Sequence, residues 1–172
     1  MAIAVLATGC SSGGGSSART TRSTVPGPQP AGQTPSEIAL MVCQPKAAGE
    51  IQDVLGETAM VEDRTWKDDL YSCTYRFSTG VLVLSVKELS SWDQTYTYFS
   101  MLGKTLGETS TLPNLGQGAF QVKNGSVVVR KDWKILLVDI TGLPSRFGLP
   151  PTSSSDVAAT VAFIILGCWA GD

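Results

Sequence analysis

The side chains that most often carry catalysis are scarce in this chain of 172 residues, or are spaced so that they cannot act together. There is no histidine, which excludes Ser-His-Asp and Cys-His nucleophiles and histidine metal sites. Two carboxylate pairs, Asp68-Asp69 and Glu62-Asp63, are adjacent in the sequence. Neighbouring side chains of a strand point to opposite faces, so neither pair predicts an acid and a base that cooperate. We expect these to be solvated loop carboxylates, and we expect no enzyme.

A glycine-rich segment and the cysteines were considered as ligand sites. Gly116-Gln117-Gly118 resembles a phosphate loop, but it lacks the Gly-Lys-Ser/Thr ending and is better explained as a turn before a strand. The cysteines are scattered along the chain, and no close-spaced pair suggests a metal site. The sequence therefore predicts no metal and no cofactor.

Cys10 is the residue whose surroundings predict a definite chemistry. Apolar residues from Ala2 to Ala7 and the small residues Thr8 and Gly9 precede it. This segment resembles the end of a bacterial lipoprotein signal peptide, in which the cysteine thiol receives a diacylglyceryl group and the chain is cut before it. The resemblance implies lipidation at Cys10. Signal peptides usually have about 15–30 residues and a positive start, so we expect residues 1–9 to be a remnant, with the true start upstream.

The composition of the rest predicts a tethered domain. The segment from Ser11 to Pro35 is rich in Gly, Ser, Thr and Pro and cannot bury enough surface to order itself. We expect residues 10–35 to be the lipidated cysteine and a disordered tether spanning roughly 25–30 Å, and residues 36–172 to be one globular domain. Hydrophobic residues make up 42% of the chain, which is enough for a core, and the net charge of −2 argues against a nucleic-acid partner.

Periodicity predicts an α+β domain. Apolar residues at helical spacing predict helices over Pro45 to Leu55 and over Trp92 to Leu106, and a third helix runs to Trp169 from a capping box near Ser153 to Asp156. The predicted strands are Met60 to Thr65, Leu70 to Phe77, Val81 to Glu88, Phe120 to Lys123, Ser126 to Lys131 and Lys134 to Ile140. We expect an antiparallel sheet packed by helices, in the order helix, strands, helix, strands, helix.

A tetrapeptide recurs at the ends of two predicted helices. Leu55-Gly56-Glu57-Thr58 is repeated as Leu106-Gly107-Glu108-Thr109, each time before a set of strands. The domain could therefore be a duplicated α-β-β unit. Four residues are equally compatible with two similar helix caps that arose by chance.

The chain resembles a group of actinobacterial lipoproteins and receptor-kinase sensor domains. The likeness rests on the lipidated cysteine, the polar tether, Cys43 ahead of Pro45, Cys73 before an aromatic residue, and the segment from Leu115 to Phe120. It implies a small α+β domain of unassigned activity outside the cell.

An exported domain meets an oxidising environment, so we expect a disulfide between Cys43 and Cys73. Pairing of Cys43 with Cys168 is the alternative. In the favoured pairing, Cys168 is a small buried hydrophobic residue of the last helix.

Surface residues of the predicted elements complete the expectations. Tyr96 and Tyr98 cannot both face the core from one helix, so the exposed one is a candidate for a recognition surface. We expect Lys87, Lys131 and Lys134 on the solvent face of strands.

Three hypotheses of function follow. The first is a non-enzymatic lipoprotein, held by its lipid on the outer side of the plasma membrane, that binds an envelope protein or ligand. The second is a carrier of an apolar molecule, with a cavity under the last helix lined by Val157, Val161, Ile164 and Ile165. The third, a hydrolase, would require a cleft with convergent polar groups. A filled core under that helix favours the first, and a continuous apolar cavity favours the second.

Overall fold

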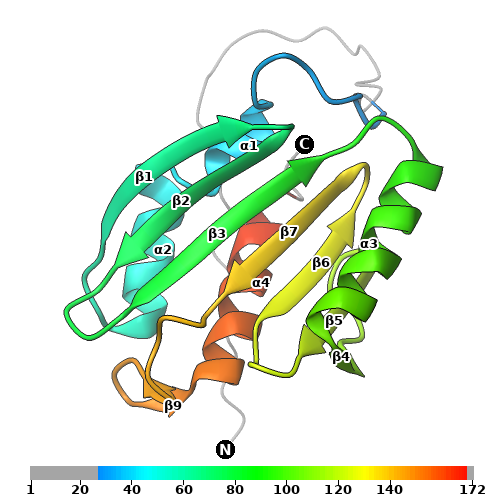
Figure 1. Ribbon diagram of the computed structural model, residues 1–172. Helices are drawn as coiled ribbons and strands as arrows, with labels where there is room; N and C mark the ends of the chain where they lie inside the picture. The colour runs from blue at the N-terminus through cyan, green and yellow to red at the C-terminus, as the bar shows by residue number, and fades with distance from the viewer. Residues whose placement is uncertain (1–26, 170–172) are drawn as a thin grey trace, which may run out of the picture.

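The computed structural model describes residues 27–169, which build one antiparallel sheet with helices on both faces (Figure 1). The sheet order is β1-β2-β3-β7-β6-β5-β4, and every neighbouring pair is antiparallel. The strands are β1 (Met60–Lys67), β2 (Leu70–Arg76), β3 (Val81–Glu88), β4 (Glu108–Thr111), β5 (Gly118–Val122), β6 (Val127–Lys131) and β7 (Lys134–Asp139). A small hairpin of β8 (Arg146–Phe147) and β9 (Thr152–Ser153) follows. The α+β class and the order of elements predicted from the sequence are confirmed.

The helices begin and end where local chemistry dictates. They are α1 (Glu37–Met41), α2 (Pro45–Leu55), α3 (Trp92–Leu106) and α4 (Ser154–Trp169). Pro45 occupies the first turn of α2, where a missing N–H costs nothing, and Ser91 caps the start of α3. Before α4, the Ser153 hydroxyl accepts from the Asp156 N–H at 3.1 Å and donates to its carboxylate at 2.6 Å. The first contact is the N-cap bond of the predicted capping box, whereas in the second the carboxylate bonds the Ser153 hydroxyl instead of the Ser153 N–H.

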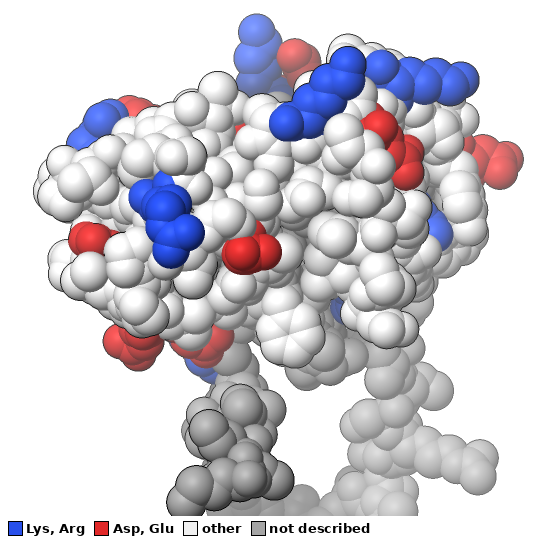
Figure 2. Space-filling view, turned by 90° about the horizontal axis from the view of Figure 1, so that it is seen from below, with Lys and Arg blue, Asp and Glu red and all other residues white. Residues whose placement is uncertain are grey.

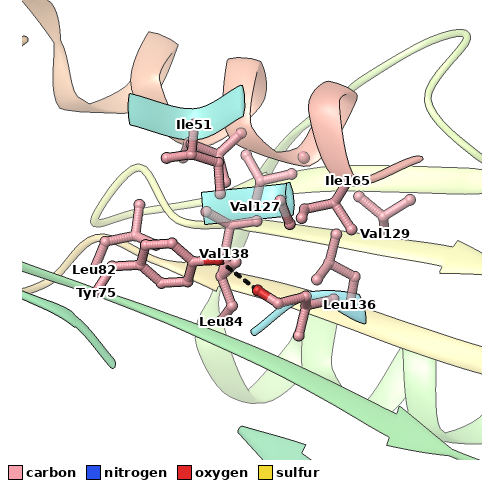
Figure 3. Packing of buried hydrophobic residues seen from close by; sticks show 14 of the residues in the cluster. Ile51, Tyr75, Leu82, Leu84, Val127, Val129, Leu136, Val138 and Ile165 are labelled. Carbon is pink, nitrogen blue, oxygen red and sulfur yellow. Dashed lines mark hydrogen bonds between the residues drawn. The ribbon is translucent and has the colours of Figure 1, made fainter. Parts of the chain in front are cut away.

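The main core lies on one face of the sheet, under α1, α2 and α4. Figure 3 shows Ile51 of α2 and Ile165 of α4 over Val127, Leu136 and Val138 of the central strands, all of them buried. Alternate residues of β3, β6 and β7 supply this face, as the period of a strand requires.

Helix α3 covers part of the opposite face. Phe99 and Leu102 pack on Phe120, Val128 and Ile135, which point away from the main core. In the part of the chain that the structure describes, the same face of β1, β2 and β3 carries no helix (Figure 1).

The repeated tetrapeptides both mark helix ends with a left-handed glycine. Gly56 has φ 65° and Gly107 has φ 76°. The helices that they close lie on opposite faces of the sheet, and α3 is followed by six strands, four of them in the main sheet, where α2 is followed by three. The shared feature is thus the cap, and duplication of a whole unit stays a prediction.

A disulfide fastens the loop before α2 to the sheet. Cys43 and Cys73 are bonded, with their Cα atoms 6.0 Å apart, as the sequence predicted. Beside the bond, the fully buried Tyr75 donates a hydrogen bond of 2.6 Å to the carbonyl of Val42. The two contacts pin the α1–α2 junction to strand β2.

The end of the predicted tether contacts the domain. The Ala31 N–H donates to Leu89 O at 3.1 Å, and the Trp66 indole donates to Gln33 O at 3.0 Å. These contacts lie just before α1. Residues 27–35 therefore include points of attachment to the sheet.

A buried charged pair follows these contacts. The hydroxyl and the N–H of Ser36 both donate to the carboxylate of Glu88, and Lys134 Nζ lies 4.0 Å from the same carboxylate oxygen. Glu88 is 3% exposed and Lys134 is 5% exposed. The prediction of a solvent-facing Lys134 is therefore wrong, because its carboxylate partner comes from a strand distant in sequence.

Candidate recognition surface on helix α3

Helix α3 exposes large apolar side chains although it packs on the sheet. Exposed fractions are 40% for Trp92, 53% for Tyr96, 46% for Met101 and 37% for Leu106. Tyr98 is turned further inward, and burial raises the pKa of its phenol above the ordinary value. Of the two tyrosines that the sequence offered as candidates, Tyr96 is thus the more exposed and the more accessible to a partner.

Tyr96 is held from below by a buried arginine. The guanidinium carbon of Arg130, a residue only 7% exposed, lies 4.2 Å from the ring centroid of Tyr96 and 5.8 Å from that of Phe99. One guanidinium nitrogen donates to the carbonyl of Gln117. Within residues 27–169 no carboxylate forms an ion pair with Arg130, so the aromatic rings are its main charge partners.

The aromatic surface continues along the helix. The ring of Trp92 lies 6.5 Å from that of Tyr96, between centroids. Rigid aromatic rings bury much area at little entropic cost, which is why Trp, Tyr and Arg are frequent anchors of protein interfaces. The geometry therefore suits recognition of a partner surface.

Two hollows flank α3 on its solvent side. One has a volume of about 580 Å³ and is lined by Tyr96, Thr97, Ser100, Met101, Lys104 and Thr105. The other, of about 840 Å³, lies between the C-terminal half of α3 and strand β4 and includes Lys123. Ser100 and Lys104 line both hollows, so the two form one continuous surface.

The predicted glycine segment supports this surface instead of binding phosphate. Gly116 has φ 61° in the turn before β5, and a Cβ there would lie 2.7 Å from the carbonyl of Arg130. The turn therefore requires glycine to approach β6 closely, and it places Gln117 O against the guanidinium. The interpretation as a turn before a strand is confirmed.

The four residues of the proposed carrier cavity lie in or beside the main core. Val157, Val161 and Ile165 are at most 1% exposed, and Ile164 packs at the edge of the cluster. Neither hollow beside α3 is lined by any of them.

The two carboxylate pairs lie in and beside strand β1. Asp68 and Asp69 form the β1–β2 turn, with Asp69 3.8 Å from Lys87. Glu62 is in strand β1, not in a loop as expected, and pairs with Arg76. Residues 27–169 contain no group of three acidic, cysteine or histidine side chains that could hold a metal.

Two further observations concern the charge of the surface and the length of the helices. Figure 2, which looks onto the end of the sheet near the β8–β9 hairpin, shows charged side chains scattered over a mostly uncharged surface. No helix within the described residues is long and apolar enough to cross a membrane. Cys10 lies outside those residues.

The sequence missed the central residue of this surface. Arg130 ends a run of three valines, and it shares the α3-facing side of β6 with Val128. The period-two alternation places it there, but an arginine at an inward position gives no sign in sequence of the rings that receive it.

Comparison of the chain with protein-family models, with curated proteins and with solved structures gave no match.

Proposed function

We propose that this chain is a non-enzymatic lipoprotein, anchored through Cys10 on the outer side of the plasma membrane, whose domain binds a protein partner through α3. The observation that carries the binding role is the exposed Trp92–Tyr96 pair with Arg130 fixed beneath it. A soluble domain gains nothing by leaving these rings in water, whereas an interface can bury them.

The anchor and the surface support one another physically. A lipid at the start of the tether confines the domain to a thin layer above the membrane, which raises its effective concentration toward envelope proteins. A modest interface is then sufficient. The disulfide between Cys43 and Cys73 suits an oxidising compartment outside the cytosol.

The carrier hypothesis has no comparable support. The side chains proposed to line its cavity are packed among core residues, as those of a filled interior are. The hollows beside α3 are open and flanked by lysines and hydroxyl groups.

Photo-crosslinking in the native host tests the binding surface. A benzophenone amino acid replaces Tyr96 in one strain and Asp53 in another, since Asp53 is an exposed polar residue of α2, across the sheet from α3. We expect a discrete crosslinked protein from position 96 and none from position 53. Identical patterns from both positions, or no adduct at position 96, would refute the proposed surface.

Fatty-acid labelling tests the anchor separately. Expressed in the native host, the unaltered chain should incorporate labelled palmitate and sediment with membranes. Cys10→Ser should do neither, and the neighbouring substitution Ser11→Ala serves as the matched control. Membrane association of the Cys10→Ser chain would place the anchor elsewhere.

A further inference from the structure

Within residues 27–169, strand β4 is paired along one edge only. It is the last strand of the sheet, and all four of its residues are exposed. The Leu112 N–H bonds Ala119 O at 2.9 Å, toward β5. Antiparallel ladders alternate, so Thr111 turns its own N–H and C=O outward. The strand contains no lysine or proline, two residues that commonly protect an edge from further pairing, although it is only four residues long and its register against β5 shifts between Glu108 and Ser110.

The groove beside this edge owes its width to small residues of α3. Ser100 and Gly103 of α3, and Gly107 at its C-cap, line the hollow of about 840 Å³ together with the four residues of β4. A Cβ on Gly103 would come within 2.9 Å of the carboxylate of Glu108, and one on Gly107 within 3.2 Å of Lys123 Cε. Larger side chains at these positions would therefore narrow the groove.

The groove carries an excess of positive charge. Lys104 and Lys123 line it, and Glu108 is its one carboxylate. Within residues 27–169 neither lysine side chain forms an ion pair or a hydrogen bond with another residue. Two exposed ammonium groups without a carboxylate partner favour an acidic occupant.

We infer that the protein partner adds an extended, acidic segment to β4 as a further strand of the sheet. The segment's backbone bonds the outward groups of Thr111, and its carboxylates lie at Lys104 and Lys123. This rests on the proposed function, because Ser100 and Lys104 join the groove to the hollow beside Tyr96. A partner seated on α3 therefore reaches the open edge.

The test uses the full-length, disulfide-bonded, ¹⁵N-labelled chain and a synthetic peptide of alternating threonine and glutamate. We expect amide shifts confined to β4 and the end of α3, with peptide-to-protein contacts at Thr111. A peptide with lysine in place of glutamate should bind more weakly by about tenfold, as should the Lys104→Glu, Lys123→Glu chain, the size expected from losing two exposed charge pairs.

Backbone variants separate strand addition from charge attraction. Thr111→Pro removes the outward N–H and should abolish binding, whereas Thr111→Val keeps it and should bind normally. A peptide methylated on alternate backbone nitrogens keeps its charges and should fail against the unaltered chain, which guards against misfolding of the proline variant. Equal binding of the methylated or the lysine peptide, or no shifts at millimolar peptide, would overturn the inference.

The outcome is distinguishable from failure of the proposed function. Peptide binding without a crosslink from position 96 would reject the α3 surface and leave the edge site standing. A crosslink from position 96 without peptide binding would reject the edge site alone.

Discussion

The guanidinium carbon of Arg130 lies 4.2 Å from the ring centre of Tyr96, and this buried contact connects strand β6 to the exposed face of α3. The aromatic side chain is thereby held in place before any partner arrives. Preorganisation of this kind lowers the entropic cost of binding.

Replacing Arg130 by lysine should destabilise the domain. The ammonium cannot stack on Tyr96 or hold Gln117 O in the same geometry, so we expect the free energy of unfolding to fall by about 1–2 kcal/mol. Urea denaturation measures the change. The exposed Arg76→Lys, whose partner is Glu62, is the control and should cost under about 0.5 kcal/mol. Equal losses would show that the rings contribute nothing.

Removal of the disulfide should cost far more than a surface change. Cys43 and Cys73 are 30 residues apart, and the Cys43→Ala, Cys73→Ala chain should lose about 3–4 kcal/mol of stability in the chain-entropy model. Thermal and urea unfolding of the two chains give the difference. Non-reducing mass mapping of the natural chain should recover the two cysteines in one linked peptide pair, and recovery of both as thiols would contradict the fold.

Stability should fall at alkaline pH partly through Tyr75. Burial raises the pKa of its phenol well above the ordinary value of about 10, so above that pH the unfolded chain has released a proton that the native chain retains. The free energy of unfolding should therefore decrease as pH rises through about 10 toward the native pKa. The Tyr75→Phe chain lacks the hydrogen bond to Val42 O, so its free energy of unfolding should be about 1 kcal/mol lower at neutral pH. Its free energy of unfolding should also depend less on pH above pH 10. Parallel curves would contradict this account.

Two glycines of the α2 region should respond oppositely to alanine. Gly49 lies inside the helix with open space around it, so Gly49→Ala should stabilise the domain by about 0.5–1 kcal/mol. Gly56 has φ 65°, and a Cβ there would lie 2.8 Å from Leu149 O, so Gly56→Ala should cost about 2 kcal/mol or more. Differential scanning calorimetry of both variants checks the sign of each change.

The buried pair of Glu88 and Lys134 should behave as a unit. Lys134→Met leaves the Glu88 carboxylate buried with only Ser36 as a donor, which should cost about 3–5 kcal/mol. The double variant Glu88→Leu, Lys134→Met should recover most of that loss. Urea unfolding of the single and double variants measures their coupling, and simple additivity would mean that the two charges do not interact.

The sequence predicted the elements whose ends carry strong local signals. The bounds of α2 and α3 agree with those expected, because Pro45, Ser91, Gly56 and Gly107 fix them through the backbone itself. The alternation of Tyr71, Cys73 and Tyr75 predicted strand β2, and the β-rich run after the Thr79-Gly80 turn predicted β3 as its hairpin partner. The capping box before α4 is likewise a local signal, and it located the start of that helix.

Features that depend on distant contacts were not predicted. Strand β4 has no apolar alternation and exists because it pairs with β5, and α1 is a single short helix capped by Ser36. The burial of Lys134 depends on Glu88, which precedes it by more than forty residues. Of the site, helical geometry predicted an exposed tyrosine, but not Arg130 beneath it or the open strand edge.

The disulfide also determines how the domain bears mechanical load. A pull on the tether first reaches the bonds at Ala31, Gln33 and Ser36, all made to the sheet or its immediate extension. Once these yield and α1 unwinds, the covalent link from Cys43 passes the force directly into β2. Unravelling from the amino end therefore meets a crosslink that keeps residues 43–73 from being drawn out.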